Sequence, residues 1–302
     1  MLVRQSKNSF IRSTERYGYV TNQLTQFDRV YNSTGADFLR EISREAKDVD
    51  EIVNHLLTIY EGVSREEIKQ DFVDFIQDLA KHRFVYIGET LEEIEKQDLD
   101  FSYADNNPKT LTSVYHQETE QKVGMSTQDY FLEEVQGAPQ ISSIQFELTS
   151  KCNERCIHCY IPNSKKDHGF DMPTAKVKSI LDEFAELGGL HVTLSGGEVF
   201  MYKDLLEVVR YCREKDLKIS ILSNLISLKD SQIPTLRECN LSLVQVSLYS
   251  TIPAVHDAIT TVKGSCEKTM ANIEKLVAAD IPVQISCPIM KANKDSYIGV
   301  VE

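Results

Sequence analysis

Apolar and polar residues alternate in short runs over the first 88 residues, and turn residues separate the runs. Such alternation predicts short strands, whereas apolar positions that recur every three or four residues predict helices. Ser64 and Glu67 have the spacing of a capping box, which marks the start of the longest helix. The predicted strands are residues 10–13, 17–22, 27–32 and 84–87, and the predicted helices begin at Ser33, span 48–60 and span 64–81.

Residues 89–140 carry a weaker pattern and are predicted to connect two domains. Residues 89–100 are acidic and favour a helix, 105–108 are turn residues, and 113–137 show weak periodicity. We therefore interpret this stretch as a linker with a bridging helix.

From Ile141 onward, strand patterns alternate with amphipathic helix patterns. This order predicts parallel strands joined by right-handed crossovers. Residues 141–302 should therefore form an α/β domain, a partial parallel (β/α) barrel whose functional residues lie at the carboxyl ends of the strands. The predicted strands are 144–149, 191–195, 217–222, 241–248 and 281–286, and the predicted helices are 175–187, 203–215, 232–238 and 266–278.

Composition and charge exclude some classes of function. The chain of 302 residues is long enough for two domains, and its formal net charge of -13 disfavours binding to nucleic-acid phosphates. The N-terminus lacks the apolar segment of a signal peptide, and no stretch has membrane-spanning length, so we expect a cytoplasmic protein with reduced thiols and no membrane partner. Seven cysteines, an odd number, suit metal binding better than a disulfide framework.

Three of the cysteines lie on one short loop after a predicted strand. Cys152, Cys156 and Cys159 offer three thiolates and no fourth, whereas a closed structural metal site takes four protein ligands. The open coordination position could accept a substrate or a cofactor. A zinc site completed by His158 or by a distant histidine is the alternative. The other cysteines are expected to be buried or half-buried thiols: Cys212, Cys239, Cys266 and Cys287.

A glycine turn with a carboxylate follows the next predicted strand, in the sequence Leu-Ser-Gly-Gly-Glu at 194–198. The CxxxCxxC loop followed by this GGE turn resembles the radical S-adenosylmethionine (SAM) superfamily. The resemblance implies that the three loop cysteines hold a [4Fe-4S] cluster whose fourth iron chelates S-adenosyl-L-methionine. It further implies one-electron cleavage of SAM to a 5′-deoxyadenosyl radical, with ferredoxin or flavodoxin as the electron donor.

The same resemblance assigns roles to residues around the cofactor. It implies that Glu198 accepts hydrogen bonds from the SAM ammonium group. It also implies that Gly196 and Gly197 let the backbone approach the methionine moiety, and that Ser247 contacts the carboxylate or the ribose.

The order of elements in residues 1–88 predicts an α+β winged helix and resembles the PqqD-like domains that bind leader peptides of ribosomally made precursors (RiPP recognition elements). A DNA-binding winged helix is the alternative. The third predicted helix carries more acidic than basic residues, which disfavours contact with phosphates. We therefore expect a leader peptide rather than nucleic acid as partner.

The two resemblances together predict a radical SAM maturase that installs a crosslink or thioether in a ribosomally synthesised precursor peptide. A maturase of a folded protein or of a cofactor precursor is one alternative, and a winged-helix regulator with a metal cluster is another. Relatives have further strand–helix units, so we expect that this chain is truncated and that it is poorly soluble or weakly active alone. Residues 293–302 are predicted to open the next helix.

Overall fold

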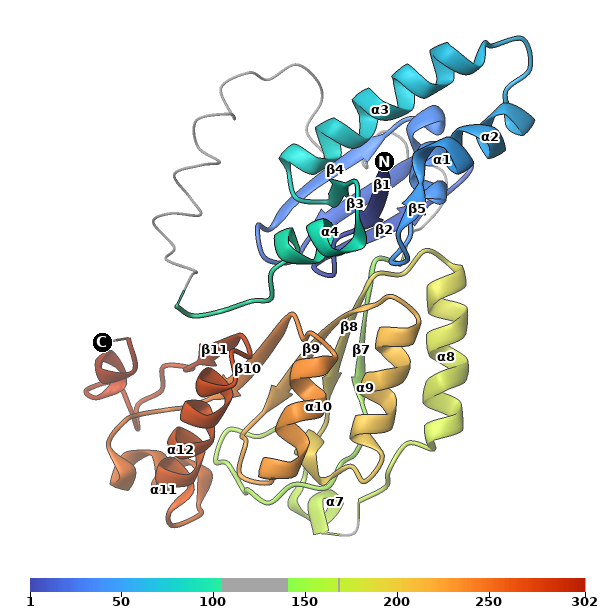
Figure 1. Ribbon diagram of the computed structural model, residues 1–302. Coiled ribbons are helices and arrows are strands. Elements are labelled where there is room, and N and C mark those ends of the chain that lie inside the picture. Colours follow the sequence, from blue (N-terminus) through green and yellow to red (C-terminus); the bar gives the residue numbers. More distant parts are fainter. Residues whose placement is uncertain (105–140, 168, 302) are drawn as a thin grey trace. The chain divides into compact units, whose positions relative to one another are not determined.

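The computed structural model describes residues 1–104, 141–167 and 169–301, and the chain forms two compact units, Met1–Gln140 and Ile141–Glu302 (Figure 1). Each unit is described by itself. The predicted turn at 105–108 and the weakly periodic stretch at 113–137 lie outside the described residues.

Within residues 1–104, the first unit contains two small antiparallel sheets and four helices. The strand orders are β2-β3-β4 and β5-β1-β6. The elements are β1 (Leu2–Gln5), β2 (Ser9–Ser13), β3 (Gly18–Asn22), β4 (Phe27–Tyr31), α1 (Ser33–Glu41), β5 (Lys47–Asp48), α2 (Val49–Ile59), α3 (Arg65–Lys81), β6 (Val85–Gly88) and α4 (Leu91–Gln97).

One apolar cluster joins both sheets to the helices. Val3 of β1, Val20 of β3, Leu39 of α1, Ile52 of α2 and Phe72 of α3 are all buried in it. The helices present apolar residues at helical spacing on one side, and this burial is the main favourable contribution to the stability of the unit. The predicted α+β fold of this part of the chain is confirmed.

The predicted capping box is also confirmed, because the Ser64 hydroxyl accepts from the Glu67 amide at 3.3 Å and the Glu67 carboxylate accepts from the Ser64 amide at 3.0 Å. Two strands were not predicted. β1 is four residues long with mixed polarity, and β5 is two residues long, so neither has a sequence pattern of its own. They exist because β1 supplies the middle strand between β5 and β6.

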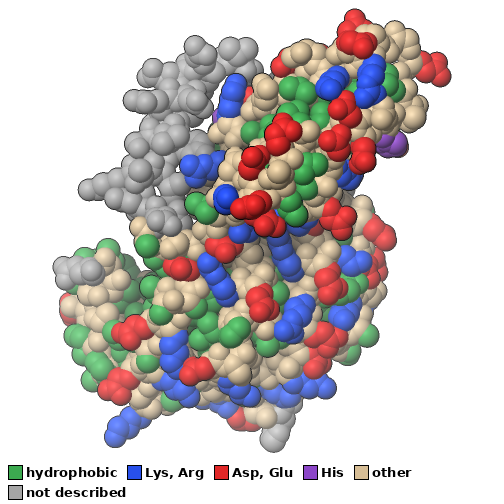
Figure 2. Space-filling model, viewed as in Figure 1, with side chains coloured by type: hydrophobic (Ala, Val, Ile, Leu, Met, Phe, Trp, Pro, Cys, Tyr) green, Lys and Arg blue, Asp and Glu red, His purple; other side chains and the backbone are tan. Residues whose placement is uncertain are grey.

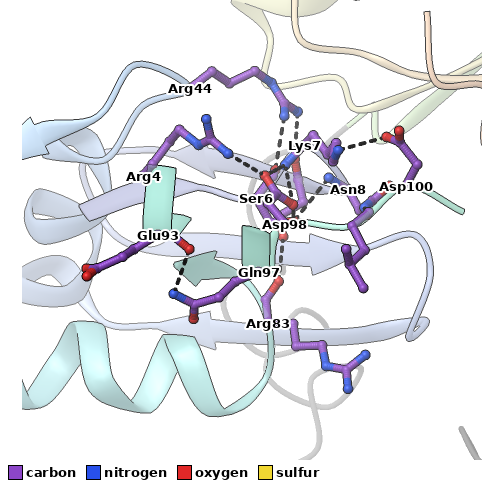
Figure 3. A network of polar contacts seen from close by, with 12 residues as sticks. Arg4, Ser6, Lys7, Asn8, Arg44, Arg83, Glu93, Gln97, Asp98 and Asp100 are labelled. Atoms are coloured by element: carbon purple, nitrogen blue, oxygen red, sulfur yellow. Dashed lines mark hydrogen bonds and ion pairs between the residues drawn. The ribbon is translucent and has the colours of Figure 1, made fainter. Parts of the chain in front are cut away.

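Figure 3 shows how the segment after β6 is fixed to the first unit. The Asp98 side chain is 1% exposed and accepts from Arg4 Nη2 at 3.1 Å, from Ser6 Oγ at 2.9 Å and from the Lys7 amide at 3.0 Å. Asn8 donates to the Leu99 carbonyl oxygen at 3.0 Å. A buried carboxylate with this many donors holds α4 against the β1–β2 connection.

The helix predicted within residues 89–100 is therefore present as α4, and its ends are tied to the first unit. Figure 2 shows acidic side chains over this helix, whose first turn carries Glu92 and Glu93.

The second unit is a parallel sheet of five strands in the order β11-β10-β9-β8-β7. Helices α8, α9 and α10 lie along one face of the sheet (Figure 1). The elements are β7 (Ser143–Glu147), α7 (Asn163–Asp167), α8 (Thr174–Glu186), β8 (His191–Ser195), α9 (Leu205–Glu214), β9 (Lys218–Ser223), α10 (Ile233–Glu238), β10 (Leu243–Ser247), α11 (Pro253–Thr260), α12 (Ser265–Ala278) and β11 (Val283–Ser286), with short 3-10 turns at Val199–Met201, Asp230–Gln232 and Tyr297–Val300.

Side-chain alternation along the strands separates an apolar face from a polar one. Val192 and Leu194 of β8 are buried with Val177 of α8 and Val208 of α9 in the main core. The intervening residues, such as Thr193, belong to the opposite face of the sheet, and those of β7 are exposed. The predicted α/β fold with parallel strands and helical crossovers is confirmed.

Three details differ from the prediction. α7 and α11 were not predicted, because α7 is only five residues long and α11 carries a weak apolar pattern. Residues 293–302 were expected to open a helix, but the structure has turns there and a single 3-10 turn at Tyr297–Val300.

Of the four cysteines outside the loop, Cys212, Cys239 and Cys266 are buried and Cys287 is half-buried, as expected. None of the described helices combines the length and the apolarity needed to cross a membrane.

Candidate functional site

The parallel sheet brings the two motifs to one edge. The cysteine loop follows β7, the Gly196-Gly197-Glu198 turn follows β8, Asn224 follows β9, and Ser247 ends β10. The carboxyl ends of parallel strands share one edge of the sheet. These residues therefore lie at the same edge, although Cys152 and Ser247 are 95 positions apart in the sequence.

The glycine turn is hydrogen-bonded directly to the start of the cysteine loop. The Gly197 amide donates to the Thr149 carbonyl oxygen at 2.7 Å, and the Glu198 amide donates to the Lys151 carbonyl oxygen at 2.8 Å. A Cβ atom on Gly197 would lie 2.3 Å from the Lys151 carbonyl oxygen, far inside van der Waals contact. The glycine therefore permits close approach of two backbones, a reason that the sequence alone did not reveal.

Glu198 connects the same turn to the end of β9. Its carboxylate is 1% exposed and accepts from Ser223 Oγ at 2.7 Å, from the Asn224 amide at 2.8 Å and from the Phe200 amide at 3.0 Å. Burial raises the pKa of Glu198, and these three donors act in the opposite direction. A carboxylate offers about four acceptor positions, so Glu198 can accept one further donor.

The cysteine loop is held on its other side by α11. The Arg155 amide donates to the Thr260 carbonyl oxygen at 3.0 Å, and the Ile157 amide donates to the Ile259 carbonyl oxygen at 2.9 Å. Asp257 accepts from the Cys266 amide at 3.0 Å and from Ser265 Oγ at 3.0 Å, which fixes α11 to the start of α12. The loop thus has backbone anchors on two separate elements.

The three cysteines differ in exposure, and their chemistry suits a soft metal. Cys152 is 8% exposed and its sulfur accepts from the Glu154 amide at 3.4 Å, while Cys156 and Cys159 are half-buried. Burial raises the pKa of Cys152 to about 11 and that of Cys156 to about 12. Metal binding must therefore release protons from these thiols, which couples metal affinity to pH.

The three thiolates on one loop suit an iron–sulfur cluster, because soft sulfur ligands stabilise iron clusters. Among the described residues, no group of three or more His, Cys, Asp or Glu side chains is arranged to hold one metal ion. Cysteine ligands of a cluster bind different irons and need not converge on one point. His158, the proposed fourth ligand for zinc, directs Nε2 to the Tyr249 hydroxyl at 3.2 Å. The zinc alternative thus gains no support from this geometry.

Buried polar atoms without a partner surround the loop. Asn153 Nδ2 and Glu154 Oε1 have no hydrogen-bond partner among the described residues, although Asn153 Oδ1 accepts from Asn224 Nδ2 at 2.9 Å. Buried polar groups are nearly always satisfied, so these two atoms are available to a polar ligand or to water. Ser247 is half-buried and pairs in register with Ser286 of β11.

Asn153, Asn224 and Tyr249 were not among the predicted site residues. Tyr249 is buried, contacts the His158 ring with centroids 5.0 Å apart, and its amide donates to His256 Nδ1 at 3.2 Å. Two of them have a positional signal in the sequence, because Asn153 follows the first loop cysteine and Asn224 lies just beyond the predicted strand 217–222.

Comparison with known proteins gives matches for both units. Residues 146–301 match the model of the radical SAM superfamily, and residues 29–85 match that of coenzyme PQQ synthesis protein D (PqqD). The chain is 31% identical over 159 residues to an AdoMet-dependent heme synthase of Methanosarcina barkeri, covering 53% of this chain and 46% of the relative. It is 30% identical over 149 residues to a PqqA peptide cyclase of Methylocella silvestris, covering 49% and 40%.

Among solved structures, Streptococcus suis SuiB bound to its precursor peptide SuiA is similar to 99% of this chain and 60% of that one, with a TM-score of 0.64 and 16% sequence identity. This likeness concerns the fold. The chain spans less than half the length of the two curated relatives above. A family model that matches more than half of the chain, together with the parallel sheet and the CxxxCxxC and GGE motifs at one edge, leads to one conclusion: the chain belongs to the radical SAM superfamily.

Proposed function

We propose that this chain is a radical SAM enzyme that modifies a ribosomally synthesised precursor peptide. The observation that supports this most strongly is the combination of its two units. A radical SAM sheet and a PqqD-like unit with an open sheet edge lie in one chain. A DNA-binding regulator would need only the PqqD-like unit, and an enzyme that acts on small molecules would need only the radical SAM sheet.

In this proposal, Cys152, Cys156 and Cys159 hold a [4Fe-4S] cluster, and SAM lies beside it. When bound, the cluster and SAM supply reductive one-electron chemistry and hydrogen-atom abstraction. The chain positions them: anchors on β8 and α11 fix the loop, and the free acceptor position of Glu198 suits an ammonium group. Ser247 is assigned to the carboxylate or the ribose of SAM.

The leader peptide is proposed to add to β4, the edge strand of the β2-β3-β4 sheet in the described part of the chain. Phe27, Arg29 and Tyr31 alternate onto the side of β4 that faces α3. Tyr31 contacts the ring of Phe75 with centroids 4.9 Å apart, and Arg29 pairs with Asp78 at 2.5 Å. A peptide strand beside β4 would thus run along α3.

The side of α3 near β4 is acidic, which favours a basic leader peptide. Glu67, Asp71, Asp74 and Asp78 recur at i, i+4, i+7 and i+11, so they form one stripe. Asp78 marks where this stripe meets β4, because it contacts Arg29 and the Tyr31 hydroxyl. The same charges disfavour DNA, whose phosphates they would repel.

The enzymatic half of the proposal is tested by anaerobic reconstitution with iron and sulfide, followed by assay of 5′-deoxyadenosine with and without dithionite. We expect dithionite-dependent product from the wild-type chain and none from the variant in which alanine replaces all three loop cysteines. Cys239→Ala is the matched control, since Cys239 is buried far from the loop in sequence and next to α10. A four-iron spectrum in the triple variant would contradict the cluster assignment.

The peptide half is tested by selecting a displayed library of random peptides on the full chain. We expect enriched peptides that contain lysine or arginine and that slow hydrogen exchange of the β4 amides. The absence of enriched peptides, together with a gel shift by duplex DNA, would favour the regulator instead. Reduced ferredoxin and reduced flavodoxin can then be compared with dithionite as donors.

A cofactor precursor as substrate is the second candidate, because one relative with 31% identity is an AdoMet-dependent heme synthase. Titration of the chain with hemin, monitored by the absorption spectrum of hemin, distinguishes a cofactor precursor from a peptide as the substrate. Specific hemin binding without any selected peptide would favour this second candidate.

A further inference from the structure

A lysine side chain is buried under the cysteine loop. Lys166 lies in α7, is 3% exposed, and donates from Nζ to the Glu154 carbonyl oxygen at 3.1 Å. Glu154 sits between Cys152 and Cys156 in the sequence, so the ammonium group lies against the part of the loop that carries these two sulfurs.

The position of this ammonium group is fixed by contacts on both sides. Arg155 of the loop forms an ion pair with Asp167, and Ser150 Oγ donates to the Lys165 carbonyl oxygen at 3.0 Å. α7 therefore folds back onto the loop immediately before and after Lys166, which holds the Lys166 backbone beside the cysteine loop.

Lys166 has no ion pair with a carboxylate in the part of the chain that is described, and the Glu154 carbonyl oxygen is its hydrogen-bond partner there. Lys166 also acts electrostatically on the Glu154 carboxylate but forms no ion pair with it, and buried ammonium groups are normally paired.

We infer that Lys166 is the counter-charge of the metal cluster and raises its reduction potential. This inference rests on the proposed cluster at Cys152, Cys156 and Cys159. Three thiolates on a bound cluster would add negative charge beside this ammonium group, which forms no ion pair with the described residues. One electron from dithionite makes the cluster more negative and breaks no bond. A fixed positive charge in a low-dielectric setting stabilises that added electron.

The test is an EPR-monitored dithionite titration of the reconstituted chain. Lys166→Met keeps the length of the side chain and removes the charge, so we expect a more negative midpoint potential with unchanged iron and sulfide content. Lys166→Arg keeps the charge and should stay close to wild type. Lys165→Met is the matched control, because Lys165 is the exposed neighbour in the same helix and its charge is screened by water.

The outcomes separate this inference from the proposed function. A wild-type chain that binds no four-iron cluster overturns both. A loaded Lys166→Met chain with the wild-type potential overturns the inference alone. If Lys166→Met binds no iron, recovery of loading in Lys166→Arg supports the role of the charge. Failure of both variants to load assigns Lys166 to packing and overturns the inference.

Discussion

Replacing Gly197 with alanine should separate the cysteine loop from the glycine turn. The added Cβ would lie 2.3 Å from the Lys151 carbonyl oxygen, 2.7 Å from the Lys151 carbonyl carbon and 2.7 Å from the Ser150 carbonyl oxygen. All three are backbone atoms, so no flexible side chain can move aside. The two strand-end loops must shift apart to relieve the contact.

The shift breaks hydrogen bonds that now connect the loops. The Gly197 amide bond to Thr149 and the Glu198 amide bond to Lys151 are 2.7 and 2.8 Å long. Losing two such bonds costs about 1–3 kcal/mol, and overpacking adds about 1–3 kcal/mol. We therefore expect the free energy of unfolding to fall by about 2–6 kcal/mol and iron binding to be lost.

Gly188→Ala is the matched control for this experiment. Gly188 follows α8 and has φ of +80°, and a Cβ added there would meet no atom within 4 Å, so the substitution adds only backbone strain of about 1–2 kcal/mol. Urea unfolding followed by circular dichroism gives the stabilities, and iron per chain after reconstitution reports on the loop. A Gly197→Ala chain with wild-type iron content and a stability within about 0.5 kcal/mol of wild type would refute the reasoning.

Three further predictions concern other parts of the chain. Asp98→Ala should destabilise the first unit by about 3 kcal/mol in urea unfolding, because it leaves the partly buried Arg4 unpaired. The control Asp100→Ala removes an exposed ion pair and should cost under about 1 kcal/mol. Equal losses of stability in the two variants would contradict this prediction. Burial lowers the pKa of His191 below its usual 6.5, so the unfolded chain binds the proton more readily and stability should fall as pH drops from 7 to 5; His191→Gln should flatten this slope, and unchanged slopes would argue against it. Asp71→Asn with Asp74→Asn should weaken binding of a selected basic peptide by about 2- to 30-fold in fluorescence anisotropy, and an unaltered affinity would exclude the acidic stripe as its contact.

Sequence patterns predicted the second unit well where each element buries an apolar face. The strand at His191–Ser195 was predicted with its observed bounds, because Val192 and Leu194 alternate with polar residues and the pair Gly188-Gly189 ends the preceding helix. The strands β1 and β5 could not be predicted, since their pairing depends on partners more than 40 residues away in the sequence.

The residues of the candidate site likewise fall into those that the sequence predicted and those that only the folded chain reveals. The cysteines and the glycine turn are visible as motifs, so their meeting at one sheet edge follows from parallel topology. Lys166 carries no motif, and its place beside the loop is set by how α7 folds back. Asn224 lies just beyond a predicted strand, but its hydrogen bond to Asn153 is visible only in the folded chain. Glu198 shows the limit most clearly: a sequence motif suggests a ligand contact, whereas only the folded chain reveals that three protein donors already use its carboxylate.

The anchors of the cysteine loop have a consequence for how the protein matures. They come from the turn after β8 and from the end of α11, elements that lie about 40 and about 100 residues downstream of the loop. During synthesis the thiols therefore leave the ribosome well before their supports do. In a nascent chain the cysteine loop would not yet have its folded conformation. A cellular iron donor should therefore recognise the completed sheet rather than the cysteine segment.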